Sequence, residues 1–388
     1  MADMTAPVTA PPTQEELLLR LSKVREGMKK AGLDYYLTAH TDNVYYLTNF
    51  SYIPFERPFF LIIAADGAQV MILPGLELSH AQDRVIPDVV YKTYYEYPAP
   101  PGKGFEDALK EVIPSNAKVG VESSLSLALK DVAPGDVMVI DLVDEARVVK
   151  SDYEVGRIAY AAQVCDEGLK KIFELSKPEA MELTFFSEAG RHMMGKVVME
   201  VPGLNLLVSK FLGAVWPKNL SAQPHSVPGL FDLLEEGGPQ VTIIAAQADG
   251  YSAELERTFF IGSVPEEAKT PFKVMEEARA LAYDLVKPGV RAEDVDRAVL
   301  KVLQDAGYGD CILHRTGHGF GITGHEPPWI ALGSDAVLEK NMVISIEPGI
   351  YIQGLGGFRH SDTVLVTDNG CQSLTNGPAG LEDLILPV

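Results

Sequence analysis

The residues of this sequence that could do chemistry lie in four short polar groups, all in the second half of the chain. Glycine beside a histidine lets other groups approach the imidazole closely. A carboxylate that ends an apolar strand needs a partner or a ligand if it is buried. The groups are 223–226 with His225, 250–258 with Glu254 and Glu256, 317–328 with His318 and His325, and 345–362 with Glu347 and Arg359.

The elements that must position these groups differ before and after residue 150. Strands alternate with helices over residues 13–150, which predicts a small α/β N-terminal domain. Long amphipathic helices and two strand pairs follow over residues 151–388. The pairs join 241–246 to 257–262 and 343–346 to 364–367, and they are compatible with two halves of one curved sheet. We expect residues 1–12, rich in Ala, Pro and Thr, to form a disordered tail.

Composition narrows the class of protein. The chain has 388 residues, of which 46% are hydrophobic and 22% charged, a profile typical of a soluble globular protein. Its formal net charge of −21 disfavours nucleic acid as a partner. Three cysteines without CxxC spacing argue against a disulfide framework and a thiolate zinc site. The sequence has neither a signal-peptide pattern nor an apolar run of membrane-spanning length, so we predict a cytoplasmic location and no membrane partner.

The order of the motifs resembles a known superfamily. GY…ERT, GHGFG, GHEPP, EPG and GFR…D occur in this order over residues 150–388. They are similar to the C-terminal catalytic domain of the creatinase, prolidase, aminopeptidase P and methionine aminopeptidase superfamily. Residues 43–48 resemble the N-terminal domain of the family more weakly. The resemblance implies an α/β (α+β) protein whose C-terminal domain has the pita-bread fold, with helices over a curved antiparallel sheet.

The metal-ligand positions implied by the resemblance are only partly filled. Metallopeptidases of the family hold two divalent ions with two aspartates, a histidine and two glutamates. Isoleucine offers no donor atom and serine is a poor ligand for such ions. We therefore expect no two-metal mechanism, no metal ion and no other cofactor. The five positions fall at Ile243, Glu254, His318, Glu347 and Ser361.

A metal-free branch of the superfamily matches these motifs better. Residues 255–258, Leu-Glu-Arg-Thr, resemble a run of creatinase, which hydrolyses a guanidino C–N bond. The resemblance makes Glu256 and Glu347 the carboxylates that hold a planar cationic group. It makes His225 the group that moves a proton from water to the leaving nitrogen. We interpret the chain as a metal-independent hydrolase of a C–N bond in a small amidine, guanidino or related amide compound.

Further residues are expected to bind this small-molecule substrate. Phe55 and Arg57 lie in a segment that resembles the one that grips the substrate carboxylate across the subunit interface, so a homodimer is implied, with Arg57 reaching the partner's site. We also expect His318 and His325 to bind the substrate. Trp329 stands where the family has a second carboxylate-binding arginine, which argues against creatine itself as the substrate. We expect His314 and His360 to be structural or exposed.

Two alternatives stay open. The GHEPP run is peptidase-like, and Glu254, His318 and Glu347 could form the remodelled single-metal site of an Xaa-Pro-type metallopeptidase. The fold could also serve as a non-catalytic binding module. Five converging polar groups argue against that second alternative, because a decayed site has no physical reason to keep them.

Overall fold

The computed structural model describes residues 6–388, and the chain divides into two compact units. The N-terminal unit spans Pro11–Arg147. The C-terminal unit spans Val148–Val388 and includes residues 6–10. None of the helices in residues 6–388 is both long and apolar enough to cross a membrane.

The N-terminal unit is a six-stranded mixed sheet of order β4-β3-β2-β1-β5-β6 with helices packed against it. Strand β2 is antiparallel to both of its neighbours, and the remaining pairs are parallel. Buried Leu37, Phe60, Ile72, Leu109 and Val119 belong to its core. The elements are α1 (Gln14–Ala31), β1 (Tyr35–Thr38), α2 (Thr41–Thr48), β2 (Phe60–Ala64), β3 (Gln69–Pro74), α3 (Leu78–Arg84), β4 (Val89–Tyr94), α4 (Phe105–Val112), β5 (Lys118–Val121), α5 (Leu127–Val132), β6 (Asp136–Val139) and α6 (Leu142–Val148).

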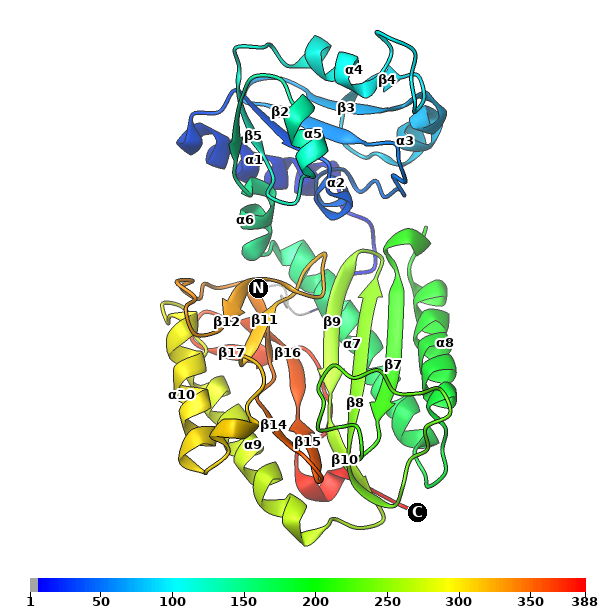
Figure 1. Ribbon diagram of the computed structural model, residues 1–388, viewed down its shortest axis with the longest axis vertical. Helices are drawn as coiled ribbons and strands as arrows, with labels where there is room; N and C mark the ends of the chain where they lie inside the picture. Colours follow the sequence, from blue (N-terminus) through cyan, green and yellow to red (C-terminus); the bar gives the residue numbers. More distant parts are fainter. Residues whose placement is uncertain (1–5) are drawn as a thin grey trace. The chain divides into compact units, whose positions relative to one another are not determined.

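The C-terminal unit is built on a ten-stranded sheet (Figure 1). Its main path runs β12-β11-β13-β16-β9-β8-β10-β18, β7 pairs with β8, and β17 pairs with β16. All pairs are antiparallel except β10 with β18. The strands are β7 (Lys210–Trp216), β8 (Gly237–Ala248), β9 (Tyr251–Glu256), β10 (Thr258–Ile261), β11 (Gly317–Gly319), β12 (Glu326–Ile330), β13 (Val343–Ile346), β16 (Ser361–Val366), β17 (Cys371–Ser373) and β18 (Ile385–Leu386), with a separate hairpin of β14 (Gly349–Ile352) and β15 (Gly356–Arg359).

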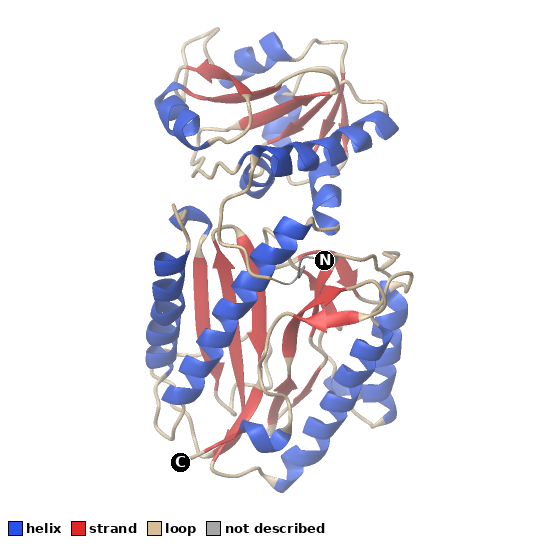
Figure 2. Ribbon diagram, turned by 180° about the vertical axis from the view of Figure 1, so that it is seen from behind, coloured by secondary structure: helices blue, strands red, loops and turns tan. Residues whose placement is uncertain are grey.

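Four helices pack against this sheet: α7 (Asp152–Leu175), α8 (Glu182–Glu200), α9 (Glu266–Leu285) and α10 (Ala292–Asp305). Figure 2 shows α7 lying across one face of the sheet, where it contacts β8 and β9. A capping box begins α7, since the side chains of Ser151 and Glu154 each accept a hydrogen bond from the other's backbone N–H. A Cβ on Gly168 would lie 2.7 Å from Met193 Sδ and 2.9 Å from Ile244 Cγ2, so glycine allows α7 to approach both α8 and β8 closely.

The polar run 250–258 contains a strand, β9, that we did not predict. The expected pairing of 241–246 with 257–262 is present only in part, at Val241 opposite Thr258. The C-terminal part of β8, from Ile244 to Ala248, pairs instead with β9, where Ala245 lies opposite Glu254. Strand β9 alternates, so Ser252, Glu254 and Glu256 share one face, and Leu255 lies on the other. The second predicted pair is confirmed, with Val343 opposite Leu365.

The predicted disordered tail lies partly outside the described residues, which begin at residue 6. From there the chain is held by α7. Val8 N donates to Gly156 O at 2.9 Å, and Ala10 O accepts from Tyr153 Oη at 3.0 Å and from Arg157 Nη1 at 2.8 Å. Satisfied backbone groups therefore give residues 6–10 a defined path, where composition alone predicted disorder.

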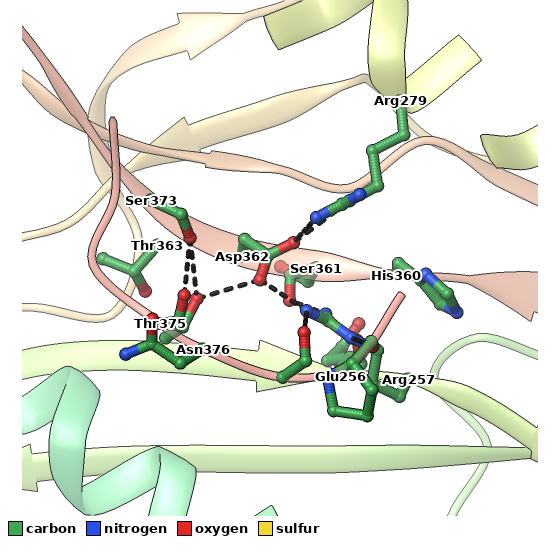
Figure 3. Close-up of polar contacts among 12 residues, drawn as sticks. Glu256, Arg257, Arg279, His360, Ser361, Asp362, Thr363, Ser373, Thr375 and Asn376 are labelled. Atoms are coloured by element: carbon green, nitrogen blue, oxygen red, sulfur yellow. Dashed lines mark hydrogen bonds and ion pairs between the residues drawn. The ribbon is translucent and has the colours of Figure 1, made fainter. Parts of the chain in front are cut away.

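A buried ionic network joins β9 to β16 and α9 (Figure 3). Asp362 accepts from Arg257 Nη2 at 2.7 Å, from Arg279 Nη2 at 2.5 Å and from Thr375 Oγ1 at 2.9 Å. Arg257 also donates to the carbonyls of Glu256 and Ser361. Asp362 and Arg257 are each only 1% exposed, so the loss of either partner would leave an unpaired charge in the interior.

We predict that Asp362→Asn lowers the free energy of unfolding by about 3–5 kcal/mol, the usual effect of breaking a buried ion pair. Denaturant unfolding measures this, and Asp368→Asn is the control, because Asp368 is 71% exposed and pairs with a surface lysine. Burial alone would raise the pKa of Asp362, but Arg257 and Arg279 lower it to about 2. The wild type should therefore lose this contribution as the pH falls from 3.8 toward 2. Equal unfolding free energies for the two variants would contradict the prediction.

Candidate active site

Five strands of the C-terminal unit bring the predicted site residues together. Glu254 and Glu256 lie on one face of β9, and Ser361 of β16 pairs with Glu256 in the strand register. His318 is the central residue of β11, and Glu347 directly follows β13. Arg359 ends β15. The site therefore forms only when residues from 254 to 361 meet in one sheet and its adjoining hairpin.

Three carboxylates converge here, of which Glu256 is buried and Glu254 and Glu347 are partly buried. Oxygen atoms of Glu254, Glu256 and Glu347 lie within 4.8 Å of one another. Glu254 Oε1 accepts from Ser361 Oγ at 2.9 Å. Burial and the nearby charge of Glu347 raise the pKa of Glu254 above its ordinary value. Like charges at this spacing repel strongly, so the cluster requires cations or protons.

The guanidinium of Arg359 neutralises part of this negative charge. Arg359 binds Glu256 through two nitrogens, with Nη2 at 2.9 Å from Oε1 and Nε in contact with Oε2. Its Nη1 donates to Tyr351 Oη at 3.0 Å, and that hydroxyl lies 2.7 Å from His314 Nε2. Since His314 Nδ1 lies 2.8 Å from the carbonyl of Arg315, Tyr351 donates to Nε2 and Nδ1 carries the imidazole proton.

Two histidines border the carboxylates. His318 Nε2 lies 3.1 Å from Glu347 Oε1, and its ring stacks on His325 with centroids 3.8 Å apart. Donor atoms of His318, His325 and Glu254 also lie within 4.8 Å of one another. Burial would lower the pKa of His318, but Glu347 raises it above the ordinary value. In the other direction, burial opposes the ionisation of Glu347, yet His318 brings its pKa down to about 2.

The geometry changes the role predicted for Glu256. We expected this carboxylate to hold a cationic substrate together with Glu347. In the structure both of its oxygens are bound by Arg359. A carboxylate satisfied by a bidentate guanidinium has little capacity left for a second planar cation. Arg359 therefore pairs with the carboxylate that the creatinase-like interpretation assigns to a cationic substrate.

The remaining predicted residues lie away from the carboxylates. His225 is exposed on the loop between β7 and β8, near enough to His314 and His325 to lower the pKa of each. Phe55 and Arg57 belong to the N-terminal unit, where Arg57 pairs with Glu56 at 2.7 Å and with Glu96 at 2.5 Å. Their approach to a partner's site stays a prediction.

Sequence reasoning missed the roles of Arg359, Tyr351 and His314. The available signals were the GFR motif for Arg359 and the four-residue spacing from His314 to His318. A Cβ on Gly349 would lie 2.9 Å from His314 Nε2 and 2.8 Å from Tyr351 Oη, so the glycine of the EPG motif makes room for this pair.

His360, expected to be structural or exposed, is fully buried and lies 3.6 Å from Glu276.

The metal-binding donor atoms of this site match the two-metal centre of the family only in part. Ile243 shares the face of β8 that carries Ala245, which pairs with Glu254, and offers no donor atom. Ser361 uses its hydroxyl to donate to Glu254. The remaining groups meet within 4.8 Å in two overlapping sets, Glu254 with His318 and His325, and Glu254 with Glu256 and Glu347. Carboxylate and imidazole ligands in this number suit one divalent ion and not two.

We predict that Arg359→Met lowers the free energy of unfolding by about 3–5 kcal/mol, because Glu256 is left as a buried, unpaired carboxylate. Arg359→Met combined with Glu256→Gln should recover part of that loss, since neither charge then remains alone. Denaturant unfolding of the two single variants and the double variant gives the coupling. Losses that simply add in the double variant would contradict a direct Glu256–Arg359 pair.

Comparison with known proteins identifies the family. Residues 156–368 match the model of metallopeptidase family M24, and residues 20–149 match the creatinase/prolidase N-terminal domain. The chain is 28% identical to an Xaa-Pro dipeptidase of Pyrococcus furiosus, over 92% of this chain and 97% of that protein. It is 31% identical to an uncharacterized peptidase of Bacillus subtilis, over 68% of this chain and 71% of that protein.

A solved structure shows the same fold. The prolidase of Pyrococcus horikoshii OT3 superposes with a TM-score of 0.81 at 27% identity, covering 93% of this chain and 99% of the prolidase. The expected fold, an α/β N-terminal domain followed by a pita-bread domain, is thereby confirmed. These relatives are peptidases, so the similarity does not support the metal-independent, creatinase-like branch. With its family model matched over more than half of its length, the chain belongs to metallopeptidase family M24.

Proposed function

We propose that this chain is a dipeptidase of the Xaa-Pro type that works with a single divalent metal ion. The observation that carries the proposal is the charge of the site: three buried or partly buried carboxylates lie within 4.8 Å of one another, and the one guanidinium beside them is paired with Glu256. The names of the relatives support a peptidase. The donor set supports one ion rather than two.

Glu254, His318 and Glu347 would hold the ion. The two carboxylates offset its charge, and His318 offers Nε2, because its Nδ1 lies 3.2 Å from the Gly319 carbonyl that fixes the ring. Such an ion would supply Lewis-acid activation of the peptide carbonyl and of water. Manganese and cobalt suit this mixture of oxygen and imidazole ligands.

The surrounding residues would orient the substrate. Arg359 fixes Glu256 beside the ligands, so that its carboxylate cannot swing into the site. His325 stacks on His318 and is exposed, which places a hydrogen-bonding ring beside the reacting carbonyl. His225, on its exposed loop, is our candidate for delivering a proton to the leaving amine.

The amidinohydrolase interpretation has less support than the peptidase. It needs Glu256 free to bind a cation, and Arg359 occupies that carboxylate. The binding-module alternative predicts no turnover of any peptide. A homodimer in which Arg57 reaches the partner's site remains a further proposal, which light scattering after size-exclusion chromatography would test.

Metal removal tests the proposal directly. Chelation should abolish hydrolysis of an Xaa-Pro dipeptide, and manganese or cobalt should restore it, because no residue replaces the Lewis acid. Elemental analysis of the reloaded protein should find one ion per chain, and His318→Ala should lower this content. Full activity of a protein shown to be metal-free would overturn the proposal.

Restoring the missing ligands gives a second test. Ile243→Asp combined with Ser361→Glu supplies a donor at each of the two family positions that lack one. We expect this double variant to bind two ions per chain, because bridging carboxylates are what two neighbouring cations require. Ile243→Asn combined with Ser361→Gln is the matched control without the added charge. Equal metal content in the two double variants would contradict our account of why the wild type takes one ion.

A further inference from the structure

An arginine beside the site has unused hydrogen-bonding capacity. Arg315 lies four residues before Gly319 and is partly buried. Its Nε donates to the Gly317 carbonyl at 3.0 Å. Across residues 6–388, no hydrogen bond or ion pair is found at its terminal nitrogens, Nη1 and Nη2. A guanidinium fixed at one end with two nitrogens free is suited to a planar anion such as a carboxylate.

An aromatic ring fixes the plane of this guanidinium. Arg315 Cζ lies 4.7 Å from the centroid of the Trp329 ring, within the range of a cation–π contact. Trp329 is 38% exposed on β12, although most of its neighbours in the strand are buried. The stacked pair therefore presents an ordered positive group at a surface that ligands can reach.

The pair lies close to the proposed reacting centre. The Gly317 carbonyl that holds Arg315 belongs to the peptide bond that leads into His318. His325 directly precedes β12, the strand that carries Trp329, and both side chains are exposed. Arg315 is also near enough to His325 to contribute to the lowered pKa of that imidazole.

The two other arginines assigned to the site, Arg359 and Arg57, are already paired with carboxylates. Arg359 binds Glu256 and Tyr351, and Arg57 binds Glu56 and Glu96. A substrate with a free carboxylate would otherwise be repelled by Glu254, Glu256 and Glu347. Binding such a substrate close to these groups requires a cation, and Arg315 has the free nitrogens to act as one.

We propose that Arg315, held against Trp329, anchors the free C-terminal carboxylate of the substrate. This assignment rests on the proposed dipeptidase function and narrows its substrate class. The residue released by hydrolysis must carry the carboxylate, so dipeptides are substrates and their C-terminal amides are poor ones. Arg315 is thus a specificity-determining residue that lies outside the sequence motifs.

Alanylproline and its C-terminal amide test this role with the manganese-loaded enzyme. The wild type should favour the free acid. Arg315→Met should lower kcat/KM for the acid by about 10- to 100-fold, the range of a charge-assisted hydrogen bond, mainly through KM. The same variant should hydrolyse the amide with the same kcat/KM as the wild type. The kcat/KM of Arg315→Lys for the acid should lie between the values of the wild type and Arg315→Met. Lysine keeps the positive charge but lacks the paired N–H groups of the guanidinium.

Calorimetric binding of free proline, with prolinamide as comparison, gives a readout that needs no turnover. The wild type should bind proline more tightly than prolinamide, and Arg315→Met should remove that difference. Arg297→Met, on the exposed surface of α10, is the matched control and should bind as the wild type does.

The outcomes separate the two proposals. An equal loss on acid and amide in Arg315→Met would show a structural role and overturn the anchor, as would proline binding that survives the substitution. If the wild type hydrolysed neither probe, the dipeptidase proposal would fail. Proline binding that depends on Arg315 would still support the anchor in that case.

Discussion

The C-terminal unit depends on one electrostatic constraint, the convergence of three buried or partly buried carboxylates within 4.8 Å of one another. Such groups cannot all be ionised in a low-dielectric interior without nearby positive charge. Arg359 supplies one cation, and its own position is fixed by Tyr351 and, through Tyr351, by His314. The remaining excess negative charge is what makes the site receptive to a metal ion. Every strand that contributes a ligand must therefore hold its register.

The sheet keeps this reactive cluster separate from the network that stabilises it. Adjacent residues of a strand point to opposite faces, so Glu256 turns toward Arg359, and Arg257 turns toward Asp362. The same alternation in β16 separates Ser361, which contacts Glu254, from Asp362, which binds two arginines. The structural ion pairs thus hold β9 against β16 without consuming the donors that face the site.

Sequence patterns predicted the fold better than the site. The apolar periodicity after residue 150 predicted long amphipathic helices, and α7 is one of them. Residues 251–256 alternate between apolar and polar side chains, with Tyr251, Ala253 and Leu255 on the packed face, so strand β9 could have been predicted from its period of two. The residue types at Ile243 and Ser361 are the sequence feature on which our proposal of one ion rather than two is based. Yet the sequence could not reveal that Arg359 pairs with Glu256, since the two residues are 103 positions apart and meet only when the chain folds back.

The most direct test of the central claim is anomalous diffraction from crystals of the protein grown with manganese. A single peak bounded by Glu254, His318 and Glu347 is the result that the account predicts. Crystals that show no peak there, prepared from protein that hydrolyses dipeptides at its full rate, would contradict it.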